Sequence, residues 1–117
     1  MGFIVVRATG TPFERGRAIG RGLGQGIHDA LGFVERYLET HGIGTHSLDH
    51  VLAPYVAASE AALPHLVEQL RGMADGAEQP FSMLMAANAF EEIYGQVELG
   101  TPPPAARAMH RRGARRP

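Results

Sequence analysis

The 117-residue sequence contains no cysteine, no tryptophan and no lysine, because all eleven of its basic residues are arginine. Without cysteine, the chain itself excludes disulfide scaffolds, thiolate zinc sites and a thiol nucleophile. The absence of lysine excludes a Schiff-base lysine and the lysine of a phosphate-binding loop. Any chemistry in which the chain takes part therefore uses other side chains, or a cysteine that another chain supplies.

Long apolar runs are also missing. No stretch approaches the ~18 apolar residues of a membrane span, and the segment from Met1 to Arg7 lacks the basic lead and the longer apolar region of a signal peptide. We therefore expect a cytoplasmic chain without a membrane partner. Its length and its apolar content of 44% predict one small globular unit with a modest core.

Charge is distributed unevenly along the chain. Residues 1–100 contain six arginines and all twelve acidic residues, whereas residues 101–117 contain five arginines and no acid. The second segment is rich in proline, alanine and arginine and has no hydrophobic period, so we predict a body over residues 1–100 and an extended or disordered tail over residues 101–117. The tail lacks interleaved aromatic residues and follows an acidic body, which favours a solvated linker over a nucleic-acid contact.

Hydrophobic spacing predicts an α+β chain that is mostly helical and has one N-terminal strand. Residues 3–8 are apolar and largely β-branched, and a turn sequence follows them, which is typical of a short buried strand. Apolar residues at spacings of three and four predict four helices: residues 14–40, a helix capped by Ser47 and kinked or divided by Pro54, residues 63–77, and residues 83–96 after a Ser82 cap. A lone strand lacks ladder partners, so we expect them in another chain or in a continuation that this chain has lost.

Glycines recur on one face of the first predicted helix. Gly16, Gly20 and Gly24 are four residues apart, and each glycine inside a helix costs about 0.8–1.0 kcal/mol relative to alanine. A face without side chains lets another backbone approach closely, so we interpret these glycines as a face that docks on a sheet or on a partner helix. The alternative is a loop over residues 17–26, with a helix that begins near Ile27.

The remaining glycine and histidine patterns predict no cofactor or metal site. The glycines after residue 10 match neither the phosphate-binding loop nor the dinucleotide-binding fingerprint. His46 and His50 are four residues apart, a spacing compatible with metal ligands, but no H-E-x-x-H glutamate follows His46. We interpret this segment as a solvated helix start.

The end of the last predicted helix carries polar groups that need partners. Asn88 and Glu92 are four residues apart and share one face, while Phe90 and Tyr94 indicate that much of this helix is buried. A carboxylate on a buried helix must find hydrogen-bond partners or lose its charge. The alternative is an exposed pair, Glu91 and Glu92, at a helix end.

Two blocks of the sequence resemble the isopenicillin-N acyltransferase family of N-terminal-nucleophile cysteine hydrolases. Residues 10–20 match the pattern G-T-P-aromatic-E-x-G-x-x-x-G. Residues 69–77, followed by Asn88 and Glu92, are similar to the pattern E-x-x-G-x-A-x-G-A with a later L-N-x-x-x-E. The second block departs from the family pattern at two positions, Gln69 and Ala87.

The resemblance implies that this chain is the N-terminal α chain of an autoprocessed enzyme. In that family a precursor cleaves itself before a cysteine, and the separate β chain that begins with this cysteine carries the nucleophile and most of the sheet. The two chains together would form an αββα sandwich, to which residues 3–8 would add a strand. Pro117 would be the last residue before the cleaved bond, and no catalytic residue would lie on this chain.

On this resemblance we expect an amidohydrolase or acyltransferase that acts, together with the β chain, on a small acylated amine, a peptide or a β-lactam-like substrate, without a metal or cofactor. Asn88, Glu92 and Tyr94 would be substrate-pocket or supporting residues. The glycine face would dock the partner, and the strand-to-helix turn would be fixed by Thr11, Glu14 and Arg15. The alternative is a non-catalytic helical interaction module that docks on a partner through its glycine-rich helix face.

Overall fold

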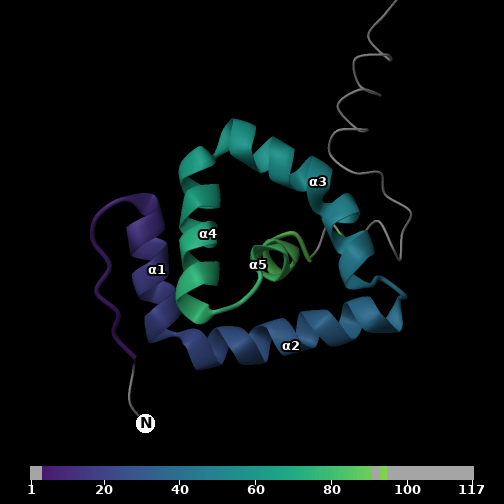
Figure 1. Cartoon of the computed structure of the whole chain (residues 1–117), viewed down its shortest axis with the longest axis horizontal. Helices are drawn as coiled ribbons and strands as arrows, with labels where there is room; N and C mark the ends of the chain where they lie inside the picture. Colours follow the sequence, from purple (N-terminus) through teal and green to yellow (C-terminus); the bar gives the residue numbers. More distant parts are fainter. Residues whose placement is uncertain (1–3, 91–92, 95–117) are drawn as a thin grey trace, which may run out of the picture.

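The computed structural model describes residues 4–90, 93 and 94, with the side chains of Thr45 and His46 left out. Five helices follow one another in this part of the chain: α1 (Pro12–Gly22), α2 (Gly24–Thr40), α3 (Thr45–Ala62), α4 (Pro64–Ala77) and α5 (Phe81–Asn88). Figure 1 shows α1 beside α4, and α5 end-on in the middle, where it contacts α2, α3 and α4.

The predicted N-terminal strand is wrong, and so is the α+β fold class that was based on it. Residues 4–9 are neither helix nor strand, and the fold is all-helical over the residues that the structure describes. Ile4 and Val5 are 72% and 83% exposed, while Val6 lies against Gly22 at the end of α1. The prediction failed because β-branched composition is a local preference, whereas a strand needs a second strand with which to pair, and the described residues contain none.

The start of α1 is fixed by contacts within its own sequence. Thr11 is the N-cap, and its hydroxyl accepts a hydrogen bond from the backbone N–H of Glu14 at 3.1 Å. Pro12 occupies the first turn, where a missing N–H leaves no helix bond unmade. Arg15 donates to the carbonyl oxygen of Gly10 at 2.6 Å, and Gly10 has a φ of 97°. These residues fix the point at which α1 begins, and the segment before it is irregular rather than a strand.

The helix predicted over residues 14–40 is two helices. Between α1 and α2, Leu23 has φ −113° and ψ 18°, which lies outside the helical region. The other residues from 17 to 26 are helical, so the alternative of a loop is also wrong. Gly22, Gly24 and Gly26 weaken helix formation around Leu23. The chain therefore changes direction here, and α1 follows α4 while α2 runs along another side of the molecule (Figure 1).

The contact between α1 and α4 is made through glycines on both helices. A Cβ atom at any of four glycines would overlap a backbone carbonyl oxygen of the opposite helix: Gly16 that of Gln69, Gly20 that of Met73, Gly72 that of Phe13 and Gly76 that of Arg17. Gly16 and Gly20 thus make a close backbone approach, and the helix that they approach belongs to the same chain. Gly24 has no atom of another segment within 4 Å of its Cβ position. Docking of a separate chain on this face stays a prediction.

The later helices depart from their predicted bounds. α3 begins before its predicted cap, Ser47, and continues through Pro54 as one helix. The bounds of α4 agree with the predicted range of 63–77 within one residue. α5 begins at Phe81, so Ser82 lies inside it, and it ends at Asn88. Ala89 forms a turn, Phe90, Ile93 and Tyr94 are again helical, and the rest of the predicted range up to residue 96 lies outside the described residues. The predicted tail, residues 101–117, lies outside the described residues.

The hydrophobic core surrounds α5 and the residues that follow it. Ala86 and Ile93 have no exposed surface, and Leu52 of α3 is 2% exposed. The main cluster also contains apolar side chains of the neighbouring helices: Val34, Leu38, Leu48, Tyr55 and Leu70. α5 is therefore the element against which α2, α3 and α4 are positioned.

Candidate functional site

Asn88, one of the three predicted pocket residues, lines a pocket of about 280 Å³ between α3, α4 and α5. α3 contributes Tyr55, Ala58 and Ser59 to its walls, and α4 contributes Leu66, Val67 and Leu70. Met85, Asn88 and Ala89 complete the lining from α5 and its end. The pocket is thus formed by three helices that the core holds together.

The walls of this pocket are mainly apolar, and three of its side chains carry polar atoms: Tyr55, Ser59 and Asn88. Asn88 donates from Nδ2 to the carbonyl oxygen of Leu84 at 2.9 Å, one helical turn earlier. Its Oδ1 accepts no hydrogen bond from the described residues. The pocket therefore combines apolar walls with a hydrogen-bond acceptor, which suits a ligand that carries an apolar group beside an N–H donor.

Tyr94 does not line the pocket of Asn88. Its side chain is 44% exposed, and its ring centroid lies 6.4 Å from that of Tyr37 on α2. Tyr37 also packs edge-on against Phe90, with ring centroids 4.9 Å apart. Tyr94 is therefore part of an aromatic cluster against α2. Glu92 and Pro117 lie outside the described residues, so their roles stay predictions.

Tyr55, Ser59 and Leu66 are pocket residues that the sequence analysis missed. Tyr55 and Ser59 are four residues apart on α3, and Leu66 and Leu70 are four residues apart on α4. Such spacing places each pair on one helix face. It does not distinguish a face that packs in the core from one that borders a pocket, because that difference depends on how three helices are placed.

Two ion pairs in the described part of the chain connect helices, and neither lies in this pocket. Arg17 of α1 pairs with Asp75 of α4 at 2.9 Å, and Arg71 of α4 pairs with Glu60 of α3 at 2.8 Å. The guanidinium of Arg71 also lies 4.2 Å from the ring centroid of Phe81. All four charged side chains are at least 39% exposed, so these pairs assist helix packing only weakly.

The described part of the chain shows neither a metal site nor a membrane span. No group of three His, Asp or Glu side chains among the described residues is placed to hold a metal ion. His46, one of the two histidines considered as ligands, has no described side chain. None of the helices in the described ranges is long and apolar enough to cross a membrane.

Compared with family models, with curated proteins and with solved structures, the chain matches none. The resemblance to the isopenicillin-N acyltransferase family therefore rests on the motif residues of the sequence. What these residues do in the fold, and what the pocket of Asn88 can hold, are the grounds on which a function is proposed.

Proposed function

We propose that this chain is the α subunit of an autoprocessed amidohydrolase or acyltransferase of the N-terminal-nucleophile type, with the cysteine nucleophile on a separate β chain. The observation that carries the proposal is the contact between the two motif blocks. Gly16 and Gly20 of the first block lie in the same contact as Gly72 and Gly76 of the second, although 48 residues lie between Gly20 and Gln69. The glycines of the two motif blocks thus form one contact in the fold. This supports the interpretation that the two blocks belong to one family signature.

The second block also leads to the pocket. α4 carries Gly72 and Gly76 and contributes Leu66 and Leu70 to the pocket walls, and Asn88 is the next residue of the family pattern. Pockets for drug-sized ligands measure ~300–1,000 Å³, so a volume of about 280 Å³ suits a smaller group. An apolar acyl group fits the wall chemistry, because each buried methylene contributes about 0.8 kcal/mol. The Oδ1 of Asn88 is placed to accept a hydrogen bond from an amide N–H.

The proposed reaction assigns the covalent steps to the β chain and substrate binding to this chain. The α-amine of the cysteine takes the thiol proton, the resulting thiolate attacks the amide carbon, and the carbonyl electron pair moves onto oxygen. The tetrahedral intermediate then collapses, and the amine leaves with a proton from the α-ammonium group of the cysteine. Water or a second amine attacks the acyl-enzyme and releases the product. This chain holds the acyl group, and we place the complex in the cytoplasm.

Intact-mass analysis of the complex purified from its natural source tests this assignment. We expect this chain to copurify with a second chain whose first residue is cysteine, and the complex to hydrolyse fluorogenic N-acyl aminocoumarin amides. Replacing the cysteine with alanine should abolish the hydrolysis. A folded, monomeric 12.6 kDa chain without a companion would refute the proposal.

Ala58→Phe tests the pocket itself, because Ala58 lies in its wall. In the two-chain complex, the phenylalanine should fill part of the pocket and lower kcat/KM more for octanoyl than for acetyl amides. Ala57→Phe is the matched control, since Ala57 is the neighbouring exposed alanine of α3 and does not line the pocket. Equal effects of the two variants on both substrates would show that the acyl group does not bind here.

The alternative of an interaction module that docks through the glycine face receives no support from the fold. α4 covers Gly16 and Gly20, which are buried. A partner could bind their face only by displacing α4, and of the three glycines predicted to dock a partner only Gly24 has open space at its Cβ position. We therefore do not propose this function.

A further inference from the structure

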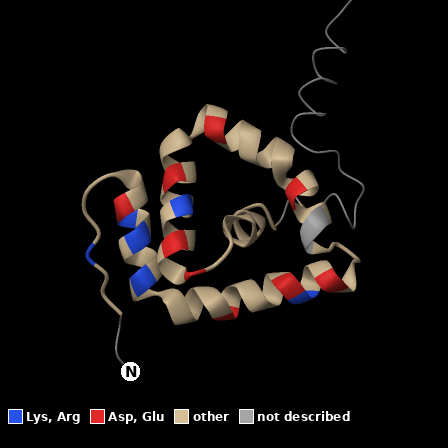
Figure 2. Ribbon diagram, viewed as in Figure 1, with Lys and Arg blue, Asp and Glu red and all other residues tan. Residues whose placement is uncertain are grey.

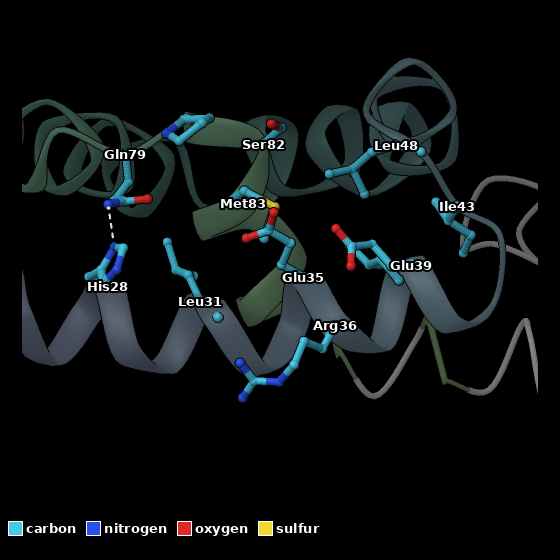
Figure 3. Close-up of a pocket in the computed structure, with 14 residues that line it drawn as sticks. His28, Leu31, Glu35, Arg36, Glu39, Ile43, Leu48, Gln79, Ser82 and Met83 are labelled. Atoms are coloured by element: carbon cyan, nitrogen blue, oxygen red, sulfur yellow. Dashed lines mark hydrogen bonds between the residues drawn. The ribbon is translucent and has the colours of Figure 1, made fainter.

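A second cleft, of about 640 Å³, lies along α2 and is open to solvent. It is bounded by α2, by the α2–α3 connection and by the start of α5 with the residues just before it (Figure 3). Its apolar lining includes Leu38, Ile43, Leu48 and Met83. At one end His28 and Gln79 form a hydrogen bond of 3.3 Å between their side chains. The cleft contributes nothing to the pocket of Asn88, because the two have no lining residue in common.

Two carboxylates give this cleft a negative charge. Figure 3 shows the side chains of Glu35 and Glu39 directed into it from α2; Arg36 also borders the cleft, but its guanidinium group is directed away from the two carboxylates. Among the described residues neither glutamate has an ion-pair partner. Like charges at this helical spacing destabilise a helix by about 0.2–0.5 kcal/mol. A cationic group in the cleft would remove this repulsion.

The chain itself contains a segment of complementary chemistry. Residues 107–116 carry five arginines and no acid, and Met109 lies between Arg107 and Arg111. Arginine guanidinium groups bind carboxylates in a forked geometry, and methionine adapts to irregular apolar surfaces. We propose that the cleft along α2 binds residues 107–116 of this chain, with arginines on Glu35 and Glu39 and Met109 on the apolar lining.

The connection between the described part and this segment is long enough. Tyr94 lies beside α2, since its ring is 6.4 Å from that of Tyr37. Twelve residues lie between Tyr94 and Arg107, and an extended chain spans up to ~3.3–3.6 Å per residue. That reach exceeds the ~10–12 Å diameter of the helix around which the segment must pass. A tether of this kind gives an effective concentration in the millimolar range, so weak ion pairs suffice to populate the contact.

Figure 2 shows that acidic side chains predominate along α2, whereas basic side chains gather on α1. Asp29, Glu35 and Glu39 belong to α2, and Arg36 is its one basic residue. Arg15, Arg17 and Arg21 belong to α1. The basic segment is thus attracted to α2 and repelled by α1. The inference does not depend on the proposed enzymatic function.

Paramagnetic NMR of the full chain tests the proposal. Since the sequence has no cysteine, Ala114→Cys gives one attachment point for a nitroxide label. At low ionic strength we expect the label to broaden the amide signals of Gly32, Gly44 and Ser82, which line the cleft. Raising the salt concentration should restore the signals, because the Debye length falls from about 30 Å at 0.01 M to about 3 Å at 1 M.

The double substitution Glu35→Gln and Glu39→Gln should abolish this broadening. The matched control is Asp49→Asn with Glu68→Gln, which changes the net charge equally at two exposed positions outside the cleft. Absence of broadening at the cleft in the labelled parent would overturn the proposal, and so would an equal loss in both double variants. The proposal also fails if broadening occurs only when labelled and isotope-enriched chains are mixed, since the occupant then comes from a second copy.

Discussion

Replacing Gly20 with alanine should destabilise the chain, although alanine is the better helix former. The alanine Cβ would overlap the carbonyl oxygen of Met73 and lie 2.9 Å from the backbone nitrogen of Ala77. Both are main-chain atoms of α4, so no side chain can rotate away to make room. α1 must move away from α4, and this movement also loosens the adjacent contacts of Gly16 and Gly76.

The expected magnitude follows from two effects of opposite sign. Helix propensity favours alanine over glycine by about 0.8–1.0 kcal/mol. Forcing an extra carbon into a packed contact costs about 1–3 kcal/mol, and overlap with backbone belongs at the upper end of this range. The free energy of unfolding should therefore fall by roughly 1–2 kcal/mol. This is a substantial part of the ~5–15 kcal/mol by which small domains are stable.

Urea unfolding followed by circular dichroism measures this change, and Gly26→Ala is the matched control. Gly26 lies inside α2 and has no atom within 4 Å of its Cβ position, so alanine there should raise the free energy of unfolding by about 0.5–1 kcal/mol. With a denaturant slope of about 1–3 kcal/mol/M, the two midpoints should differ by on the order of 1 M. If Gly20→Ala raised the midpoint as much as Gly26→Ala does, α1 and α4 would not be in backbone contact.

Three other substitutions test local features of the fold. Thr11→Ala removes the cap of α1 and should lower the free energy of unfolding by about 0.5–2 kcal/mol in the same urea experiment. Glu78 ends α4 with a left-handed φ of 55°, so Glu78→Gly should raise the thermal midpoint, by a stabilisation of about 1 kcal/mol. Arg17→Ala breaks a half-exposed pair with Asp75 and should cost less than about 1 kcal/mol. An Arg17→Ala effect that persists at high salt would mean that the arginine stem, rather than its charge, stabilises the contact.

The sequence predicted the helices well where apolar spacing coincides with burial. Leu31, Val34 and Leu38 follow the predicted spacing of three and four and are all buried on one face of α2. The predicted end at residue 40 is also confirmed, since α2 ends at Thr40, and Gly42, two residues later, has a φ of 72°. These features depend on the periodicity of one helix and on the conformational freedom of glycine, both of which a sequence displays locally.

The predictions that failed or stayed incomplete concern features that depend on contacts with other segments of the chain. Ile4 and Val5 have strand-like composition, but pairing requires a second strand that the described residues lack. The spacing of Gly16 and Gly20 predicted a close approach without identifying α4 as the helix approached. Asn88 was singled out as a pocket residue and does line a pocket. The walls opposite it come from α3 and α4, and no local pattern shows which faces of these helices will meet.

α4 takes part both in the packing of the motif glycines and in the wall of the proposed substrate pocket. The glycines of both motif blocks meet in the α1–α4 contact, which supports their interpretation as one family signature but does not itself bind a substrate. The same helix places Leu66 and Leu70 in the pocket wall. A retreat of α1 caused by Gly20→Ala should therefore reduce stability without selecting between acyl groups, whereas Ala58→Phe should select between them with little change in stability. Only the acyl-group selectivity expected for Ala58→Phe tests the proposed activity. The loss of stability expected for Gly20→Ala would occur in a helical protein of any function.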